Sequence, residues 1–252
     1  MKFPTPLIPA TLQQRYKRFL ADVTLEDGQS LTVHCPNPGA MMGLKDEGNR
    51  VWISDSGNPK RKLRHTLELV EAHGPDGPTL VGINTMMPNR LAEEAITAGR
   101  IDALLGYDIL RREVAYGEER SRIDILLEHG AEDLEHKARN ATKNDTRPCY
   151  VEVKNVHLVR TAGLHEFPDC KTDRGAKHLR EMASMVSKGA RAAMLYVIQR
   201  ADGDRLSFAA DLDPAYHAAF VAARNAGVEA YAIRCDITVE GIDATTPIPI
   251  VL

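Results

Sequence analysis

The chain has 252 residues, of which 43% are hydrophobic and 27% charged, and its formal net charge is −3. This length is enough for one large or two smaller globular domains, since domains most often have about 100–150 residues. The near-neutral charge excludes binding of polyanions through overall charge, so any nucleic-acid binding requires local basic clusters.

Four cysteines are scattered along the chain, and no two of them form a Cys-x-x-Cys pair. This spacing favours neither a zinc site nor a disulfide framework, and isolated thiols fit a reducing compartment. The N-terminal residues 1–9 include three prolines and no apolar stretch of the kind found in secretory signals. No apolar run approaches the roughly 20 residues that cross a bilayer. We therefore expect a cytoplasmic protein with no membrane partner.

The first 85 or so residues have the pattern of an all-β domain. Turn signals rich in glycine and proline, such as residues 36–39 and 74–78, separate short β-prone segments. Strands at this spacing predict a small five-stranded barrel, of which the oligonucleotide-binding (OB) fold is the best-known example, although the pattern alone does not select it. The predicted strands are residues 18–25, 30–34, 49–54, 66–72 and 79–83.

Helices and strands alternate after Pro88. The order is helix, three strands, helix, strand, helix, strand, which predicts a mixed α/β sheet flanked by helices. The Pro/Gly-rich stretch 74–88 contains the expected domain boundary, and the polar segment 128–148 is expected to be a solvated loop or mobile insertion. Asp173 is expected to cap the second helix. The predicted helices are 88–98, 173–188 and 214–226, and the predicted strands are 110–116, 121–127, 149–156, 192–198 and 228–234.

Charged residues interrupt two of these strands where the neighbouring residues are apolar. Asp124 lies in one strand, and Glu152 and Lys154 lie in the next. Because side chains alternate along a strand, Glu152 and Lys154 share a face, and pairing of the two strands would bring Asp124 to them. Two carboxylates, with the Val153 carbonyl, are suitable ligands for Mg²⁺ or Mn²⁺, and Lys154 can orient or deprotonate a water. The pattern predicts a metal-dependent nuclease; the alternative is an ion pair without catalytic function.

Further acidic and basic residues lie near this motif in the sequence. A fourth acid is needed in some such sites, and the candidates are Glu93, Glu94 and Glu113. The helix after the Glu-x-Lys strand contains several polar side chains that are expected to lie on its surface, with Lys177 the best candidate to contact phosphate. These side chains are Lys177, His178, Arg180 and Glu181.

Two basic clusters lie within the predicted barrel. Cations neutralise phosphates and aromatic rings stack on bases, so the two clusters together predict a nucleic-acid interface. Either cluster alone would be typical of a solvated surface. The first cluster is Arg15, Tyr16, Lys17 and Arg18, and the second is Lys60, Arg61, Lys62 and Arg64.

At these residues the chain resembles the sugar fermentation stimulation protein A family over essentially its full length. The resemblance implies an N-terminal OB-like domain over residues 1–85 and a C-terminal domain of the PD-(D/E)xK restriction-endonuclease-like fold over 86–252. It also implies DNA binding and a link to the regulation of sugar (maltose) metabolism in bacteria. The matching stretches are residues 14–23, 34–37, 89–91, 116–117 with 121–124, 152–154 and 174–181.

Carried over to this sequence, the nuclease motif assigns metal binding to Asp124 and Glu152, catalysis to these two with Lys154, and a helix acid to Glu94. Ile123 stands where the motif has proline, which leaves the chemistry unchanged. The resemblance thus implies a Mg²⁺- or Mn²⁺-dependent nuclease site in a protein that binds DNA, with RNA left open. A non-catalytic DNA-binding regulator of sugar metabolism is the alternative, and the sequence leaves open whether the chain forms a homodimer.

Overall fold

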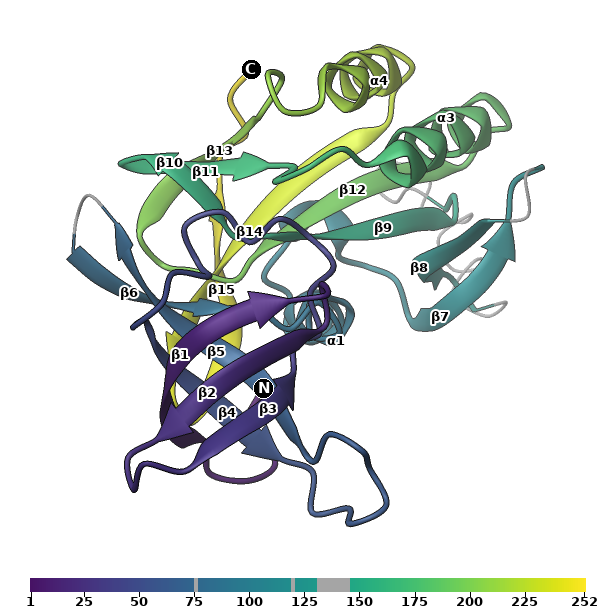
Figure 1. Ribbon diagram of the computed structural model, residues 1–252. Helices are drawn as coiled ribbons and strands as arrows, with labels where there is room; N and C mark the ends of the chain where they lie inside the picture. Colours follow the sequence, from purple (N-terminus) through teal and green to yellow (C-terminus); the bar gives the residue numbers. More distant parts are fainter. Residues whose placement is uncertain (75–76, 119–120, 131–145) are drawn as a thin grey trace.

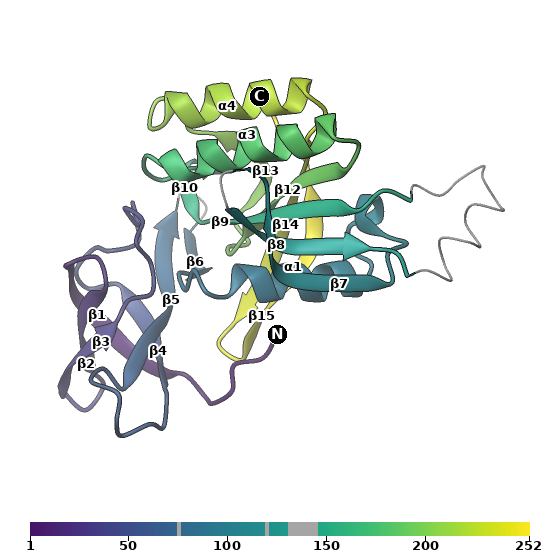
Figure 2. The same ribbon diagram turned by 90° about the vertical axis from the view of Figure 1, so that its right-hand side faces the viewer.

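The computed structural model describes residues 1–74, 77–118, 121–130 and 146–252. An N-terminal β-barrel lies beside a larger α/β part (Figure 1). Figure 2 shows the same arrangement from the side, with two helices stacked over one face of the larger sheet. Residues 131–145 of the predicted loop lie outside the described residues, so that part of the loop stays a prediction. None of the helices in the described part of the chain has the length and apolarity that crossing a bilayer requires.

The barrel strands are β1 (Ile8–Tyr16), β2 (Leu20–Leu25), β3 (Ser30–His34), β4 (Arg50–Asp55), β5 (His65–Gly74) and β6 (Gly77–Gly82). They pair in the order β3-β2-β1-β4-β5-β6, and an additional pairing of His34 on β3 with Thr66 on β5 closes five of them into a ring. β6 extends from β5 outside this ring. The predicted five-stranded barrel is therefore confirmed, but its members differ from the predicted set.

The prediction of one strand over residues 18–25 is wrong at its start. The chain turns at Lys17 and Arg18, whose φ angles of 47° and 62° are positive, and β2 begins only at Leu20. The strand before this turn, β1, was not predicted. Its apolar pattern is weak, because only Ala10 and Leu12 are buried and its last four residues are polar.

Alternation along the barrel strands separates two cores. Leu12 and Val51 point into the barrel and pack in its own core. Trp52, the next residue on β4, points the other way and joins a core that also contains Leu91 and Val151 of the α/β part. Because side chains alternate along a strand, one strand therefore contributes to both cores. The two parts share buried apolar surface.

The α/β part contains α1 (Pro88–Thr97), η1 (Asp102–Leu104), β7 (Ile109–Tyr116), β8 (Ser121–Glu128), β9 (Cys149–Val156), β10 (Leu158–Thr161), β11 (Gly163–Phe167), α3 (Asp173–Ser187), β12 (Arg191–Ile198), β13 (Gly203–Phe208), α4 (Pro214–Asn225), β14 (Glu229–Thr238) and β15 (Gly241–Ile248). Its main sheet has the order β15-β14-β12-β9-β8-β7. β12 is parallel to β9 and β14, whereas the other pairings are antiparallel. The predicted mixed α/β sheet is confirmed.

Helices cover both faces of this sheet. α1 packs on one face with β9, β12 and β15, while α3 and α4 pack against each other on the opposite face (Figure 2). A second sheet, β10-β11-β13, was not predicted, because its strands are only four to six residues long. The predicted cap of α3 is also wrong by one residue. Thr172 is the N-cap, and its Oγ1 accepts a hydrogen bond of 3.2 Å from the Gly175 N–H.

A partly buried carboxylate joins the barrel to the α/β part. Asp169 Oδ2 accepts a hydrogen bond of 3.0 Å from the Met41 N–H of the barrel and lies 3.1 Å from His157 Nε2. Burial opposes the charged form, but His157 and the Met41 N–H outweigh it and lower the pKa of Asp169 to about 2. The charged carboxylate therefore stabilises the contact between the two parts.

Asp169→Asn is expected to lower the free energy of unfolding at pH 7 by about 2 kcal/mol, because a one-unit pKa shift corresponds to about 1.4 kcal/mol. The pKa of this carboxyl is lower in the folded than in the unfolded chain. Its contribution is therefore complete above about pH 4 and is lost as the pH falls towards 2. Urea unfolding of both proteins between pH 7 and pH 2 measures the difference.

The matched control is Asp204→Asn, because the Asp204 side chain is 74% exposed and such surface changes usually stay within about 0.5 kcal/mol. A difference between Asp169→Asn and the unaltered protein that stays constant down to pH 2 would contradict the assigned role of the Asp169 charge.

Candidate functional site

Strands β8 and β9 separate at Asp124. Their ladder pairs Leu127 with Cys149 and Ile125 with Val151, and it ends there. In place of the next backbone bond, Asp124 Oδ2 accepts a hydrogen bond of 2.8 Å from the Val153 N–H. On the other side of β8, the ladder to β7 pairs Ile125 and Ile123 but not Asp124. The residue opposite Asp124 on β7 is Glu113, whose φ of 52° is positive. The distortion of both ladders leaves the Asp124 carboxylate between the two separating strands.

Glu152 and Lys154 lie on the face of β9 that α3 covers. Lys154 Nζ donates to Glu152 Oε1 at 2.5 Å, and Glu152 is only 2% exposed. The same oxygen contacts Nδ1 of His178 on α3. Arg174 Nε donates to His178 Nε2 at 3.3 Å, which assigns the ring proton to Nδ1, facing Glu152. Glu152 Oε2 is buried and has no hydrogen-bond partner among the described residues.

The two carboxylates have opposite electrostatic environments. Burial raises the pKa of Asp124, and the nearby charge of Glu152 adds to this effect against the hydrogen bonds from Val153 and Asn89. Burial also opposes ionisation of Glu152, but Lys154 and His178 outweigh it and lower its pKa. The structure therefore brings Asp124, Glu152 and Lys154 together, as the sequence predicts.

Residues for which no site role was predicted complete the surroundings. Asn89 Nδ2, in the first turn of α1, donates to Asp124 Oδ1 at 2.8 Å. His178 and Glu181 are each only 4% exposed, so the prediction that they lie on the helix surface is wrong.

Glu181 packs on Gly117, where an added Cβ would lie 2.4 Å from its Oε1. Burial raises the pKa of the neighbouring Tyr116, and the charges of Glu152 and Glu181 add to this. The signal for His178 was its place on the apolar side of α3, beside Leu179 and Met182.

Of the acids considered as a fourth member, Glu113 is exposed on β7 opposite Asp124, whereas Glu93 and Glu94 on α1 pair with other groups. Glu94 forms an ion pair of 2.9 Å with the Met1 ammonium and one of 3.1 Å with Arg90, so these contacts do not bring it to Asp124. Glu93 pairs with Arg112 of β7. The α1 side chain that reaches Asp124 is Asn89 instead.

A metal ion would have few protein ligands here. Within the described residues, no group of three or more His, Cys, Asp or Glu side chains is arranged to hold a metal. Asp124 and Glu152 supply two carboxylates, of which Glu152 retains a buried oxygen without a hydrogen-bond partner among the described residues. Because Mg²⁺ keeps several waters and binds through one or two carboxylates, this donor set fits such an ion.

Comparison with known proteins covers both parts of the chain. Residues 14–83 match the model of the SfsA N-terminal OB domain, and residues 86–241 match that of the sugar fermentation stimulation protein RE domain. Sugar fermentation stimulation protein homologs from Jannaschia sp. (strain CCS1) and Brucella ovis are 53% and 54% identical to the chain over 251 residues, covering 99% of it and 97% of each relative. The chain belongs to the SfsA family. The structure of Pyrococcus furiosus SfsA in complex with Ca²⁺ is similar, with a TM-score of 0.83 and 23% identity over 100% of this chain and 98% of that one, and shows a shared fold.

In this SfsA-family chain, the first basic cluster is only partly available for ligands. Arg15 Nη2 donates to the carbonyls of Arg18, Asn37 and Gly39 at 2.9, 2.7 and 3.0 Å, and Tyr16 Oη donates to Asp22 at 3.2 Å. Lys17 and Arg18 are exposed on the β1–β2 turn.

The second basic cluster and Lys177 differ in exposure. Lys60, Arg61 and Lys62 are exposed on the loop between β4 and β5, while Arg64 pairs with Asp55. Lys177 is half-buried on α3. Nucleic-acid binding by all these residues stays a prediction.

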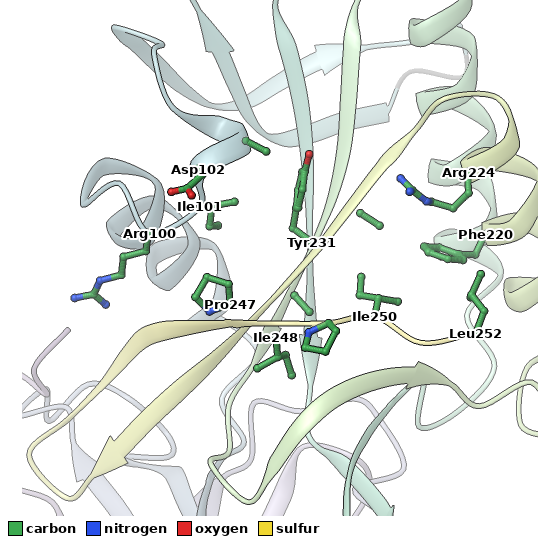
Figure 3. A pocket seen from close by; sticks show the side chains of 14 residues that line it. Arg100, Ile101, Asp102, Phe220, Arg224, Tyr231, Pro247, Ile248, Ile250 and Leu252 are labelled. Atoms are coloured by element: carbon green, nitrogen blue, oxygen red, sulfur yellow. The ribbon is translucent and has the colours of Figure 1, made fainter.

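A pocket of about 510 Å³ lies apart from the acids. Figure 3 shows Arg100 on one side of it and Phe220 and Arg224 on the other, with Ile248 of the C-terminal segment between them. Its lining from the main sheet comes from β14 and β15, and in the sheet order β12 separates these strands from β9. None of the predicted site residues lines this pocket, so it is not part of the candidate site.

Glu152→Gln is expected to lower the pKa of Asp124, because it removes the nearby negative charge and leaves the positive charge of Lys154. The pH dependence of the carboxyl carbon resonance, measured by NMR with labelled aspartate and assigned with Asp124→Asn, gives this pKa. Glu181→Gln is the control and should change it much less, since Glu181 is not among the groups that shift the pKa of Asp124. An unchanged pKa in Glu152→Gln would contradict a shared site.

Proposed function

We propose that this protein binds DNA and hydrolyses its phosphodiester bonds with the help of Mg²⁺ or Mn²⁺, and that its α/β part has a PD-(D/E)xK nuclease-like fold. The observation that supports this best is the convergence of Asp124, Glu152 and Lys154 where β8 and β9 separate. Placing the partly buried Asp124 carboxylate near the buried Glu152 carboxylate is costly unless their charge is used or compensated, and such arrangements are concentrated at functional sites.

Each of these side chains has a role that fits this chemistry. Asp124 and Glu152 would hold the metal ion, which supplies a Lewis acid beside the phosphate. The Lys154 ammonium, 16% exposed and held by Glu152, would orient the attacking water or stabilise charge on the phosphate. The Pyrococcus furiosus relative of the same fold was solved with Ca²⁺, which supports a divalent cation.

Asp124→Asn, Glu152→Gln and Lys154→Met are each expected to lower the rate of Mn²⁺-dependent DNA cleavage by at least about 100-fold, because each removes a charge required at the reacting phosphate. Single-stranded, duplex and branched DNA are incubated with the purified protein, and RNA is tested in parallel. Lys188→Ala is the control; its side chain is 47% exposed and pairs with Glu118. Cleavage that persists in Asp124→Asn and Glu152→Gln would exclude this site.

His178→Ala is expected to raise the Mn²⁺ concentration needed for half-maximal cleavage by about 10–100-fold. Mutating a residue that hydrogen-bonds a metal ligand typically lowers metal affinity by this factor. The reason is the contact of His178 with Glu152 Oε1, which fixes the carboxylate so that Oε2 is available. Metal titrations of the cleavage rate separate this effect from a lower rate at saturation. His217→Ala on α4 is the matched control, and an unchanged metal requirement in His178→Ala would refute this positioning role.

One observation favours a second candidate, a DNA-binding regulator without catalysis. Glu152 is 2% exposed and already contacts both Lys154 and His178. The cluster is therefore also consistent with a structural role as a buried ion-pair network. In that case DNA binding would weaken with salt and remain unchanged in Asp124→Asn. Binding without cleavage under all the metal conditions above would support this candidate.

A further inference from the structure

The turn between β1 and β2 displays an aromatic ring next to two cations. Phe19 is 47% exposed, which is unusual for a phenylalanine, and it follows Lys17 and Arg18. Both cationic residues have positive φ angles, a conformation that residues with a side chain rarely adopt. Such strain persists only where the surroundings hold it, and it is concentrated at functional sites.

Hydrogen bonds hold this turn in place. Arg15 binds the carbonyls of Arg18, Asn37 and Gly39, which ties the turn to the loop after β3. The Cys35 N–H donates to the Phe19 carbonyl at 2.9 Å. Phe19 is thus exposed on a backbone that hydrogen bonds hold, so a ligand that stacks on it does not have to order the turn and the entropy cost of binding is reduced.

The turn borders a pocket between the barrel and the α/β part. This pocket has a volume of about 580 Å³, and Arg18 of the barrel and Lys171 before α3 both line it. Neither cation forms an ion pair with another described residue. The acid in the pocket, Asp169, is already bound to the Met41 N–H and His157. The two cations are therefore available to an anionic ligand.

We propose that the β1–β2 turn and this pocket form a binding site for one unpaired nucleotide of a DNA strand. The base stacks on Phe19, and the adjoining phosphate binds Arg18 and Lys171 in the pocket. The DNA partner is taken from the proposed function. The strand must be unpaired because a base within a duplex already has both of its faces stacked on its neighbours. Phe19 is chosen over Tyr16 as the stacking residue because its ring is more exposed, at 47%, whereas Tyr16 is partly buried.

Phe19→Ala is expected to weaken binding of a fluorescent oligo-dT by at least about five-fold, the low end of what one stacked base contributes. Arg18→Ala and Lys171→Ala should weaken it too, and each should reduce the slope of log affinity against log salt concentration by about one. Phe19→Ala should leave this slope unchanged, because it removes no charge. Binding is measured by fluorescence anisotropy in EDTA, so neither metal nor cleavage affects the result.

Two controls test the location of the site. Leu105→Ala removes another exposed apolar side chain, 51% exposed on the α/β part, and Lys188→Ala removes an exposed cation at the far end of α3. Neither should change oligo-dT binding. A blunt duplex offers no unpaired base, so its affinity should be the same for Phe19→Ala and the unaltered protein.

Equal oligo-dT affinities for Phe19→Ala and the unaltered protein, with unchanged melting temperatures, would overturn the inference. A loss of duplex binding as large as the loss of oligo-dT binding would also overturn it, since stacking on an unpaired base would then not explain the effect. Absence of cleavage with these binding differences intact would refute the nuclease and leave the nucleotide site standing. The two proposals therefore fail separately.

Discussion

The hydrogen bond from the Val153 N–H to the Asp124 carboxylate determines the arrangement of the whole candidate site. It replaces the backbone bond that the β8–β9 ladder lacks beyond Ile125, so the strands can separate without leaving a buried donor unsatisfied. The separation has a consequence on both faces of the sheet. Ile123 packs in the core below α3 and α4, whereas Ile125, two residues later, packs in the core around α1. In a regular strand both would point to the same face. The distortion therefore positions Asp124 and Glu152 near each other.

The sequence predicted those parts of the fold in which local pattern and tertiary packing agree. α4 begins at Pro214 after the capping residue Asp213 and ends before Gly227, and β12 is buried along nearly its whole length, so both were located from sequence. β1 could not be found this way, because it is mostly polar and is defined by its partners β2 and β4 on either side. The same holds for β10 and β11, which become strands by pairing with one another and with β13. Such pairings depend on tertiary contacts, so the local sequence of one segment does not predict them.

The site was predictable to the extent that it departs from apolar strand patterns. Asp124, Glu152 and Lys154 stand out because a buried strand has no local reason to contain charges. Glu181 does not stand out, because polar residues are ordinary on a helix, and for His178 the place beside Leu179 and Met182 was the one local signal. The docking of α3 on β9 decides that both are buried. Asn89 was missed for a different reason. It reaches Asp124 from the start of α1, a contact between residues 35 positions apart. Positions of charges within strands can be inferred from sequence, whereas the side chains that surround them depend on how the layers pack.

The charges in the site bear on the order of events in the proposed reaction. Asp124 and Glu152 carry one negative charge more than Lys154 neutralises when both are ionised, and Glu181 lies close by in a buried position. A phosphate approaching this cluster alone would be repelled in surroundings of low dielectric constant, where charges interact strongly. A divalent cation held by Asp124 and Glu152 would cancel this negative charge and so remove the repulsion. The exposed cations of the barrel lie outside this cluster and are not subject to the same repulsion. Binding of a DNA strand on the barrel therefore needs no metal, whereas entry of its phosphate between β8 and β9 requires one.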